Sequence, residues 1–166
     1  VLDPENEYKN LAKNLGGTSI DVSNSNYGMI NPFQIIDGID EEENSFYSHL
    51  QFLEEFYRLI LPGINSDSLE MLNKITQELY ESKNINSKVN LKLLSNRDYP
   101  TFDDLNNLIE SKLSVETDDY IKTCLKVISN YVAKFKTGGR NSSLWNGYTT
   151  FSPKENKINT TPIIRQ

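Results

Sequence analysis

The sequence NSFYSHLQFLEEFYRLIL, residues 44–61, repeats its apolar side chains with the period of an α-helix. Tyr47, Phe52 and Leu59 add apolar surface on the other sides of this helix. A helix that is apolar on several faces is typical of the centre of a bundle. Pro62 and Gly63 end it. The main stripe comprises Phe46, Leu50, Leu53, Phe56, Tyr57 and Ile60.

Four further helices are predicted around this one, which makes about five in all. Residues 3–15 begin with Asp3 as N-cap and Pro4 at the first helical position, and they stop at a glycine pair. Residues 66–83 and 116–136 carry apolar stripes. Between them, Thr101 followed three residues later by Asp104 is a capping-box pattern, which predicts a helix through Leu113.

The chain ends are expected to add short β-strands to this mainly α fold. Residues 1–2 have the character of the end of a buried strand, and residues 18–22 alternate like a strand. Residues 144–151 could form a turn into another strand. Residues 89–94 are expected to lie on the core as an apolar tether. The class is therefore a helical bundle flanked by fragments of a sheet.

Composition excludes several kinds of function. The 166 residues include 17 basic and 23 acidic side chains, and a net charge of −6 disfavours a nucleic-acid binder. The length suits one domain, with room for an inserted subdomain. A single cysteine, Cys124, rules out an internal disulfide. The sequence contains no apolar run of about 20 residues, so no membrane insertion is expected.

Motifs for catalysis are missing from this sequence. It contains no G-x-x-x-x-G-K-[ST] phosphate loop. His49 is the only histidine, and because both it and Cys124 lie in apolar helical stripes, a structural role is favoured over a nucleophilic pair. One histidine and one cysteine cannot form a closed zinc site, and the acidic run 40–43 lacks EF-hand spacing. No catalytic residue and no metal site are expected.

Asp3 and Glu7 are the candidate cofactor-binding residues, because they follow the end of a predicted strand. They could reach a nucleotide-bound metal or orient a water. Alternatively, Asp3 caps the helix and Glu7 interacts with the helix dipole, which the spacing alone favours. The basic residues Lys134, Lys136 and Arg140 could contact phosphate or a partner, although they also suit the C-terminus of a helix.

Several motifs, in order, resemble a known family. Residues 3–8 (DPENEY), Leu11, the Leu15-Gly16-Gly17 turn and residues 30–33 (INPF) match a D-P-E-x-E-Y…L…GG…I-N-P-F/L signature. Residues 100–105 and 144–149 (LWNGYT) match more loosely. This arrangement resembles the large ATPases of conjugative type IV secretion systems, which belong to the HerA/FtsK-type clade of hexameric RecA-like motors. The resemblance spans nearly the whole chain.

The resemblance implies a division of the chain into three parts. Residues 1–33 would form an edge of a RecA-like α/β core, residues 34–140 an inserted all-α subdomain, and residues 141–166 the return toward the core. In the family, the phosphate loop lies before the first part and the Walker B acid after the last. Both motifs are missing here, so the chain alone is expected not to hydrolyse ATP.

The resemblance also implies a parent protein with Mg-ATP as cofactor, which powers assembly of a secretion channel or transfer of substrates through it. The expected partners are other subunits of a hexameric motor and components of the channel. The expected location is cytoplasmic, with attachment to the inner face of the membrane through the secretion complex. Asp3 and Glu7 would then lie closer to the nucleotide.

A free-standing helical interaction module that shares the opening motif is the alternative. It predicts a gene that begins near Val1, whereas the motor hypothesis predicts a phosphate loop encoded upstream. If the motor hypothesis holds, the surface rich in glutamate and tyrosine is a candidate contact for another subunit or a channel component. Tyr47 and Tyr57 are the first tyrosines to test, through charge reversal at Glu54 and Arg58.

Overall fold

The computed structural model describes residues 29–35, 45–140 and 142–149. Four helices of 14 to 17 residues form the body of this part: α2 (Ser45–Ile60), α3 (Ser66–Ser82), α4 (Phe102–Val115) and α5 (Asp119–Val132). Shorter helical turns connect them or follow them, and none of the described residues lies in a β-strand. The turns are η2 (Leu91–Leu93), η3 (Asn96–Asp98), η4 (Ala133–Phe135) and α6 (Ser142–Trp145).

Side-chain caps begin three of the four long helices. The Asn65 carboxamide accepts a 2.8 Å hydrogen bond from the backbone N–H of Ser68 at the start of α3. At the start of α4, Thr101 and Asp104 form the reciprocal capping box that the sequence predicts. The Asp118 carboxylate caps α5 through the N–H of Ile121. Local sequence therefore sets where these helices begin.

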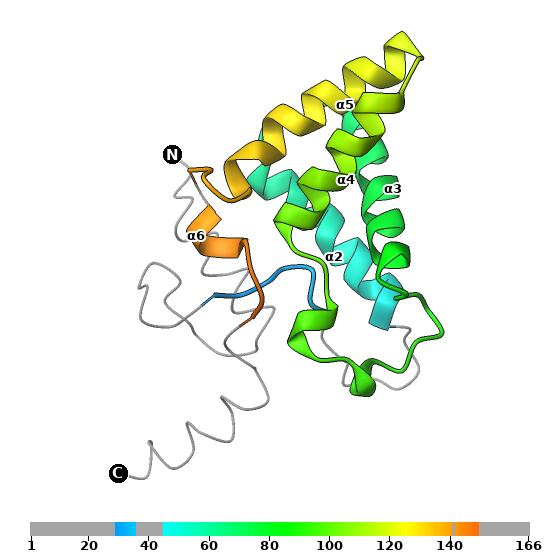
Figure 1. Cartoon of the computed structure of the whole chain (residues 1–166), viewed down its shortest axis with the longest axis vertical. Coiled ribbons are helices and arrows are strands. Elements are labelled where there is room, and N and C mark those ends of the chain that lie inside the picture. Colours follow the sequence, from blue (N-terminus) through cyan, green and yellow to red (C-terminus); the bar gives the residue numbers. More distant parts are fainter. Residues whose placement is uncertain (1–28, 36–44, 141, 150–166) are drawn as a thin grey trace.

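The bundle is arranged around α3, which packs against α2, α4 and α5. The expectation that the helix at residues 44–61 is central is therefore wrong, and Tyr47 and Leu59 of that helix are exposed. Figure 1 shows α4 and α5 as a hairpin, with its turn at the end of the bundle remote from α6. Residues 29–35 pass between α6 and the loop that leads into α4.

Aromatic side chains fill the core near this incoming segment. The rings of Phe33 and Phe102 meet edge to face at 5.0 Å between centroids, and Phe102 stacks on Phe135 at 5.0 Å. The Trp145 ring is fully buried and lies edge-on to Phe56 at 5.4 Å. The segments that precede and follow the bundle in the sequence thus share one core with α2 and α4.

The structure changes some expectations for the connecting segments. The helix predicted at residues 116–136 begins at Asp119, because Glu116 ends α4 and Asp118 caps α5. The apolar tether predicted at residues 89–94 is confirmed for Val89, Leu91 and Leu94, which pack on the core. It is wrong for Leu93, whose side chain is 80% exposed. The turn into a strand predicted at residues 144–151 differs where it is described: residues 144–145 belong to the helical turn α6, and residues 146–149 are not in a strand.

Other predictions fall outside the described residues. They are the helix at residues 3–15, the strands at residues 1–2 and 18–22, and the residues from 150 onward. The division of the chain at residues 33 and 140 also stays a prediction.

Candidate functional site

A buried hydrogen-bond junction joins the segment before the bundle to the segment after it. The backbone N–H of Asn31 donates to the Thr149 hydroxyl at 2.9 Å, and the Asn31 carboxamide donates to the carbonyl of Pro100 at 2.7 Å. The Asn31 Oδ1 atom accepts from the N–H of Phe33 at 3.1 Å. Asn31 is only 1% exposed, so all these polar groups are paired away from water.

The loop that precedes α4 also binds the outgoing segment, which here means residues 146–149. The Asn96 carboxamide donates to the carbonyl of Thr149 at 2.7 Å. The Arg97 guanidinium lies over the ring of Tyr148, 5.7 Å from its centroid. Thr149 is therefore bound through its hydroxyl by the incoming segment and through its carbonyl by this loop.

A polar cluster fixes α6 to the start of α4. The Asp103 carboxylate accepts from the Thr137 backbone N–H at 2.7 Å and from its hydroxyl at 2.5 Å. Asn146 accepts from the Asp103 N–H at 3.0 Å and donates to the Thr137 hydroxyl at 3.2 Å. Slight burial acts to raise the pKa of Asp103, but these hydrogen bonds and the charge of Lys136 hold it below its usual value.

His49 of α2 has a structural role beside the segment at residues 29–35. Its Nε2 donates to the carbonyl of Pro32 at 2.8 Å, which requires the proton to be on this nitrogen. Burial lowers the pKa of His49 to about 4, against the opposing effect of that hydrogen bond. The Tyr80 hydroxyl similarly donates to the carbonyl of Phe33. Cys124 is buried in α5 as a free thiol.

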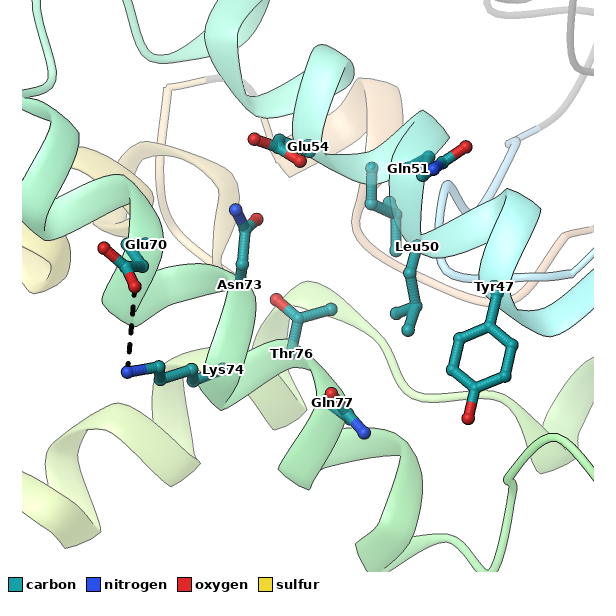
Figure 2. Close-up of a pocket in the computed structure, with 10 residues that line it drawn as sticks. Tyr47, Leu50, Gln51, Glu54, Glu70, Asn73, Lys74, Thr76 and Gln77 are labelled. Atoms are coloured by element: carbon teal, nitrogen blue, oxygen red, sulfur yellow. Dashed lines mark ion pairs between the residues drawn. The ribbon is translucent and has the colours of Figure 1, made fainter.

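A groove of about 310 Å³ runs between α2 and α3 (Figure 2). Tyr47, which is 53% exposed, lies at one end of it. Glu54 and Glu70 lie on opposite walls toward the other end. Leu50, Leu53 and Thr76 also line it.

Tyr47 and Tyr57 differ in their surroundings, although the sequence hypothesis treats both as surface residues. Tyr57 is fully buried, and its hydroxyl donates to Thr76 Oγ1 at 2.7 Å, since Thr76 itself donates to the carbonyl of Leu72. Burial raises the pKa of Tyr57 above its ordinary value. Of these two tyrosines, only Tyr47 is therefore accessible to a partner. Arg58 pairs with Glu54 at 3.0 Å and with Glu55 at 3.2 Å.

A second groove of similar volume lies between α3 and the α4–α5 hairpin. Its apolar lining includes Met71, Ile75 and Ile121. Lys112 and Glu78 also line it, and they form an ion pair at 2.5 Å. Two of the four charged groups that line this groove are thus engaged with each other, while Lys74 pairs with Glu70 outside it.

Neither a metal centre nor a membrane span is found in the part of the chain that the structure describes. Within it, no three histidine, cysteine, aspartate or glutamate side chains gather closely enough to hold an ion. None of the helices at residues 45–145 is long and apolar enough to cross a bilayer. Asp3 and Glu7, the predicted nucleotide-binding residues, lie outside the described residues.

Several junction residues lie in the sequence motifs, but their bonding partners cannot be identified from the sequence. The INPF and LWNGYT motifs contain Asn31, Asn146 and Thr149, but nothing in the sequence indicates that Asn31 bonds to Thr149. Asp103 lies in the predicted capping region, whereas its contact with Thr137, 34 residues away, is tertiary. The signal that could have pointed to this site was the presence of polar asparagines in otherwise apolar motifs.

Comparisons with known proteins give a likeness of fold. No family model matches the sequence, and no curated protein matches it. Among solved structures, VirB4 of Thermoanaerobacter pseudethanolicus is similar, with a TM-score of 0.68 and 24% sequence identity over 91% of this chain. The chain spans 38% of the length of that VirB4 chain. The shared feature is therefore the fold of one part of a larger protein.

Proposed function

We propose that this chain is the helical part of a conjugal-transfer ATPase of the type IV secretion class. The longer protein would use ATP hydrolysis to drive assembly of the secretion channel or transfer of substrates through it. Within it, this part would serve structure and contact with other proteins. The chain itself carries no phosphate loop, so the chemistry would belong to other parts of the protein.

The fold likeness to VirB4, a type IV secretion ATPase, carries this proposal. A fold alone does not determine a function, so the motifs add necessary support. The INPF and LWNGYT segments, which resemble family motifs, bond to each other through Asn31 and Thr149. The two motifs, which are far apart in the sequence, are thus in direct contact in the fold.

The junction suits a helical part that moves as one body with a motor. Both connections to the bundle are bound to each other, to the Pro100 carbonyl and to Asn96. The Asp103, Thr137 and Asn146 cluster adds further bonds beside them. A movement of the connecting segments would therefore displace the bundle as a whole. Asp3 and Glu7 are proposed to lie near Mg-ATP in the longer protein, and other subunits and channel components are its proposed partners.

The test is an ATPase assay on the longer protein. We expect a G-x-x-x-x-G-K-[ST] loop upstream of Val1, ATP hydrolysis by the longer protein, and loss of hydrolysis when the loop lysine is replaced by alanine. A protein without such a loop, or without ATPase activity, would overturn the proposal.

The role of the helical part needs a separate measurement. Asn146→Ala removes two hydrogen bonds of the cluster beside the junction. We expect ATP hydrolysis to persist in this variant and the frequency of conjugal transfer to fall. The matched control is Asn86→Ala, which removes only an exposed local bond to Lys88. Equal transfer by both variants would contradict the mechanical role of the junction.

A further inference from the structure

The pair Asn146–Gly147 is the only asparagine–glycine dipeptide in the 166-residue sequence. It directly follows α6 and leads into Thr149, which bonds to Asn31. An asparagine that precedes glycine is especially reactive toward deamidation, because glycine has no Cβ atom to obstruct its own backbone nitrogen. A chemically labile dipeptide therefore lies beside the junction.

The structure requires glycine at position 147. The φ angle of Gly147 is +148°, a backbone conformation that residues with side chains rarely adopt. A Cβ atom at this position would also collide with the Sδ atom of Met29. Glycine is therefore needed where the chain turns from α6 toward Thr149.

The structure also requires a carboxamide at position 146. The Asn146 Oδ1 atom accepts a hydrogen bond from the Asp103 N–H at 3.0 Å, and its Nδ2 donates to the Thr137 hydroxyl at 3.2 Å. An aspartate carboxylate could accept but could not donate, so it would satisfy only the first of these bonds. The labile dipeptide thus results from two separate structural needs, the turn and the polar cluster.

Deamidation of this dipeptide would be an attack of the backbone on the side chain. The Gly147 nitrogen loses its proton and forms a bond to the Asn146 Cγ atom, which closes a five-membered succinimide ring. The bond from Cγ to Nδ2 breaks, and the Nδ2 group leaves with the proton as ammonia. Water then opens the ring at either carbonyl and leaves aspartate or isoaspartate. Water is the only co-reactant that the reaction needs.

The two reacting groups are restrained differently in the fold. The N–H of Gly147 makes no hydrogen bond to any residue in the part of the chain that the structure describes. The Asn146 carboxamide, in contrast, is bound at its oxygen and at its nitrogen by residues of two other segments. It must leave these partners before its Cγ atom can turn toward the Gly147 nitrogen. The rate of reaction then follows the fraction of molecules in which the cluster is open.

We propose that Asn146 is a deamidation site gated by the cluster of Asp103, Thr137 and Asn146, and that the product keeps the cluster open. The product carries a carboxylate at position 146, which cannot donate to the Thr137 hydroxyl. It also adds a negative charge beside the Asp103 carboxylate, which accepts from the same hydroxyl at 2.5 Å. A transient opening is thereby made permanent.

Incubation of the 166-residue chain in mildly alkaline buffer, followed by peptide mass spectrometry, tests the proposal. The tryptic peptide of residues 141–154 contains both Asn141 and Asn146, and fragment ions distinguish them. We expect aspartate and isoaspartate to accumulate at position 146, and to form at least about 10-fold faster when the chain is denatured in urea. A sample without incubation corrects for reaction during digestion. Equal rates in the folded and the denatured chain would overturn the gating.

A variant that opens the cluster separates gating from general unfolding. Thr137→Val removes the hydroxyl that accepts from Asn146 and donates to Asp103, so we expect deamidation of the folded chain to become about 10-fold faster. Thr123→Val is the matched control, because the Thr123 hydroxyl makes only an exposed bond within α5. Its rate should change by less than about 2-fold. Equal rates in the two variants would contradict the role of the cluster, and circular dichroism verifies that both keep their helices.

The effect of the product is measured on a variant that mimics it. Asn146→Asp should unfold at a lower urea concentration than Asn107→Asp, which places the same new charge on the exposed side of α4. Equal midpoints would show that the product does not keep the cluster open. All these measurements use the 166-residue chain alone, so their outcome is independent of the proposed function.

Discussion

The backbone N–H of Asn31 donates to the hydroxyl of Thr149 across 118 residues of sequence. The segment that enters the bundle of α2 to α5 is therefore hydrogen-bonded directly to the segment that leaves it. The Asn31 carboxamide extends this closure to Pro100. The stability of the bundle and the position of its two connections consequently depend on the same few bonds.

Asn31→Ala tests how much this closure stabilises the protein. The variant loses the bonds to the Pro100 carbonyl and the Phe33 N–H and leaves both groups buried without their partner. We expect the free energy of unfolding to fall by about 2–4 kcal/mol. Urea denaturation measures it. Asn90→Ala, which removes only an exposed bond to the N–H of Lys92, should cost less than about 1 kcal/mol. Similar losses in both variants would refute the importance of the junction.

Trp145→Ala tests the apolar side of the junction. Trp145 is fully buried against Phe56, so its removal leaves a large cavity. We expect a loss of about 3–5 kcal/mol in the free energy of unfolding. Tyr148→Ala is the control, because Tyr148 is 39% exposed. Thermal unfolding of both variants, followed by circular dichroism, compares them, and a stable Trp145→Ala protein would contradict the packing described.

The stability should depend on pH through His49. Burial lowers its pKa from 6.5 to about 4, so between these values the unfolded chain binds a proton that the folded chain does not. The contribution of His49 is therefore fully present above pH 6.5 and is lost as the pH falls toward 4. The size of this loss is about 3 kcal/mol.

Replacement of His49 isolates its part of the pH dependence. Glutamine in the variant His49→Gln can still donate to the Pro32 carbonyl but does not titrate. We expect the curve of unfolding free energy against pH to become flatter between pH 4 and 6.5 in this variant. Curves of identical slope for the variant and the original chain would show that His49 is not buried in its neutral form.

Tyr47 and Tyr57 should behave differently when replaced. Tyr57→Phe removes a buried hydroxyl and leaves Thr76 without that donor, so we expect a loss of about 1–2 kcal/mol in stability. Tyr47→Ser should change stability by less than about 1 kcal/mol, because this side chain is 53% exposed. Chemical denaturation of the two variants measures the difference. A larger loss for Tyr47→Ser would contradict its surface position.

The sequence by itself predicted the four long helices of the described part and the start of α4, although it placed the start of α5 at residue 116 instead of Asp119. The Thr101 and Asp104 capping box joins residues three positions apart, and the apolar stripe of α2 depends on neighbours within about four positions. The same stripe includes Tyr57 and leaves Tyr47 outside it, although the sequence hypothesis named both as candidate surface contacts. Such features are set by local hydrogen bonds and by helical periodicity, which can be followed along the chain.

Only the tertiary structure decided which residues meet across the bundle. The bonds from Asn31 to Thr149 and from Asp103 to Thr137, and the groove between Glu54 and Glu70, join segments whose contact no local pattern encodes. The central position of α3 likewise follows from how four amphipathic helices cover one another's apolar faces. These contacts depend on the packing of many side chains at once, because burial of a shared core selects one arrangement among several that the helices alone would allow.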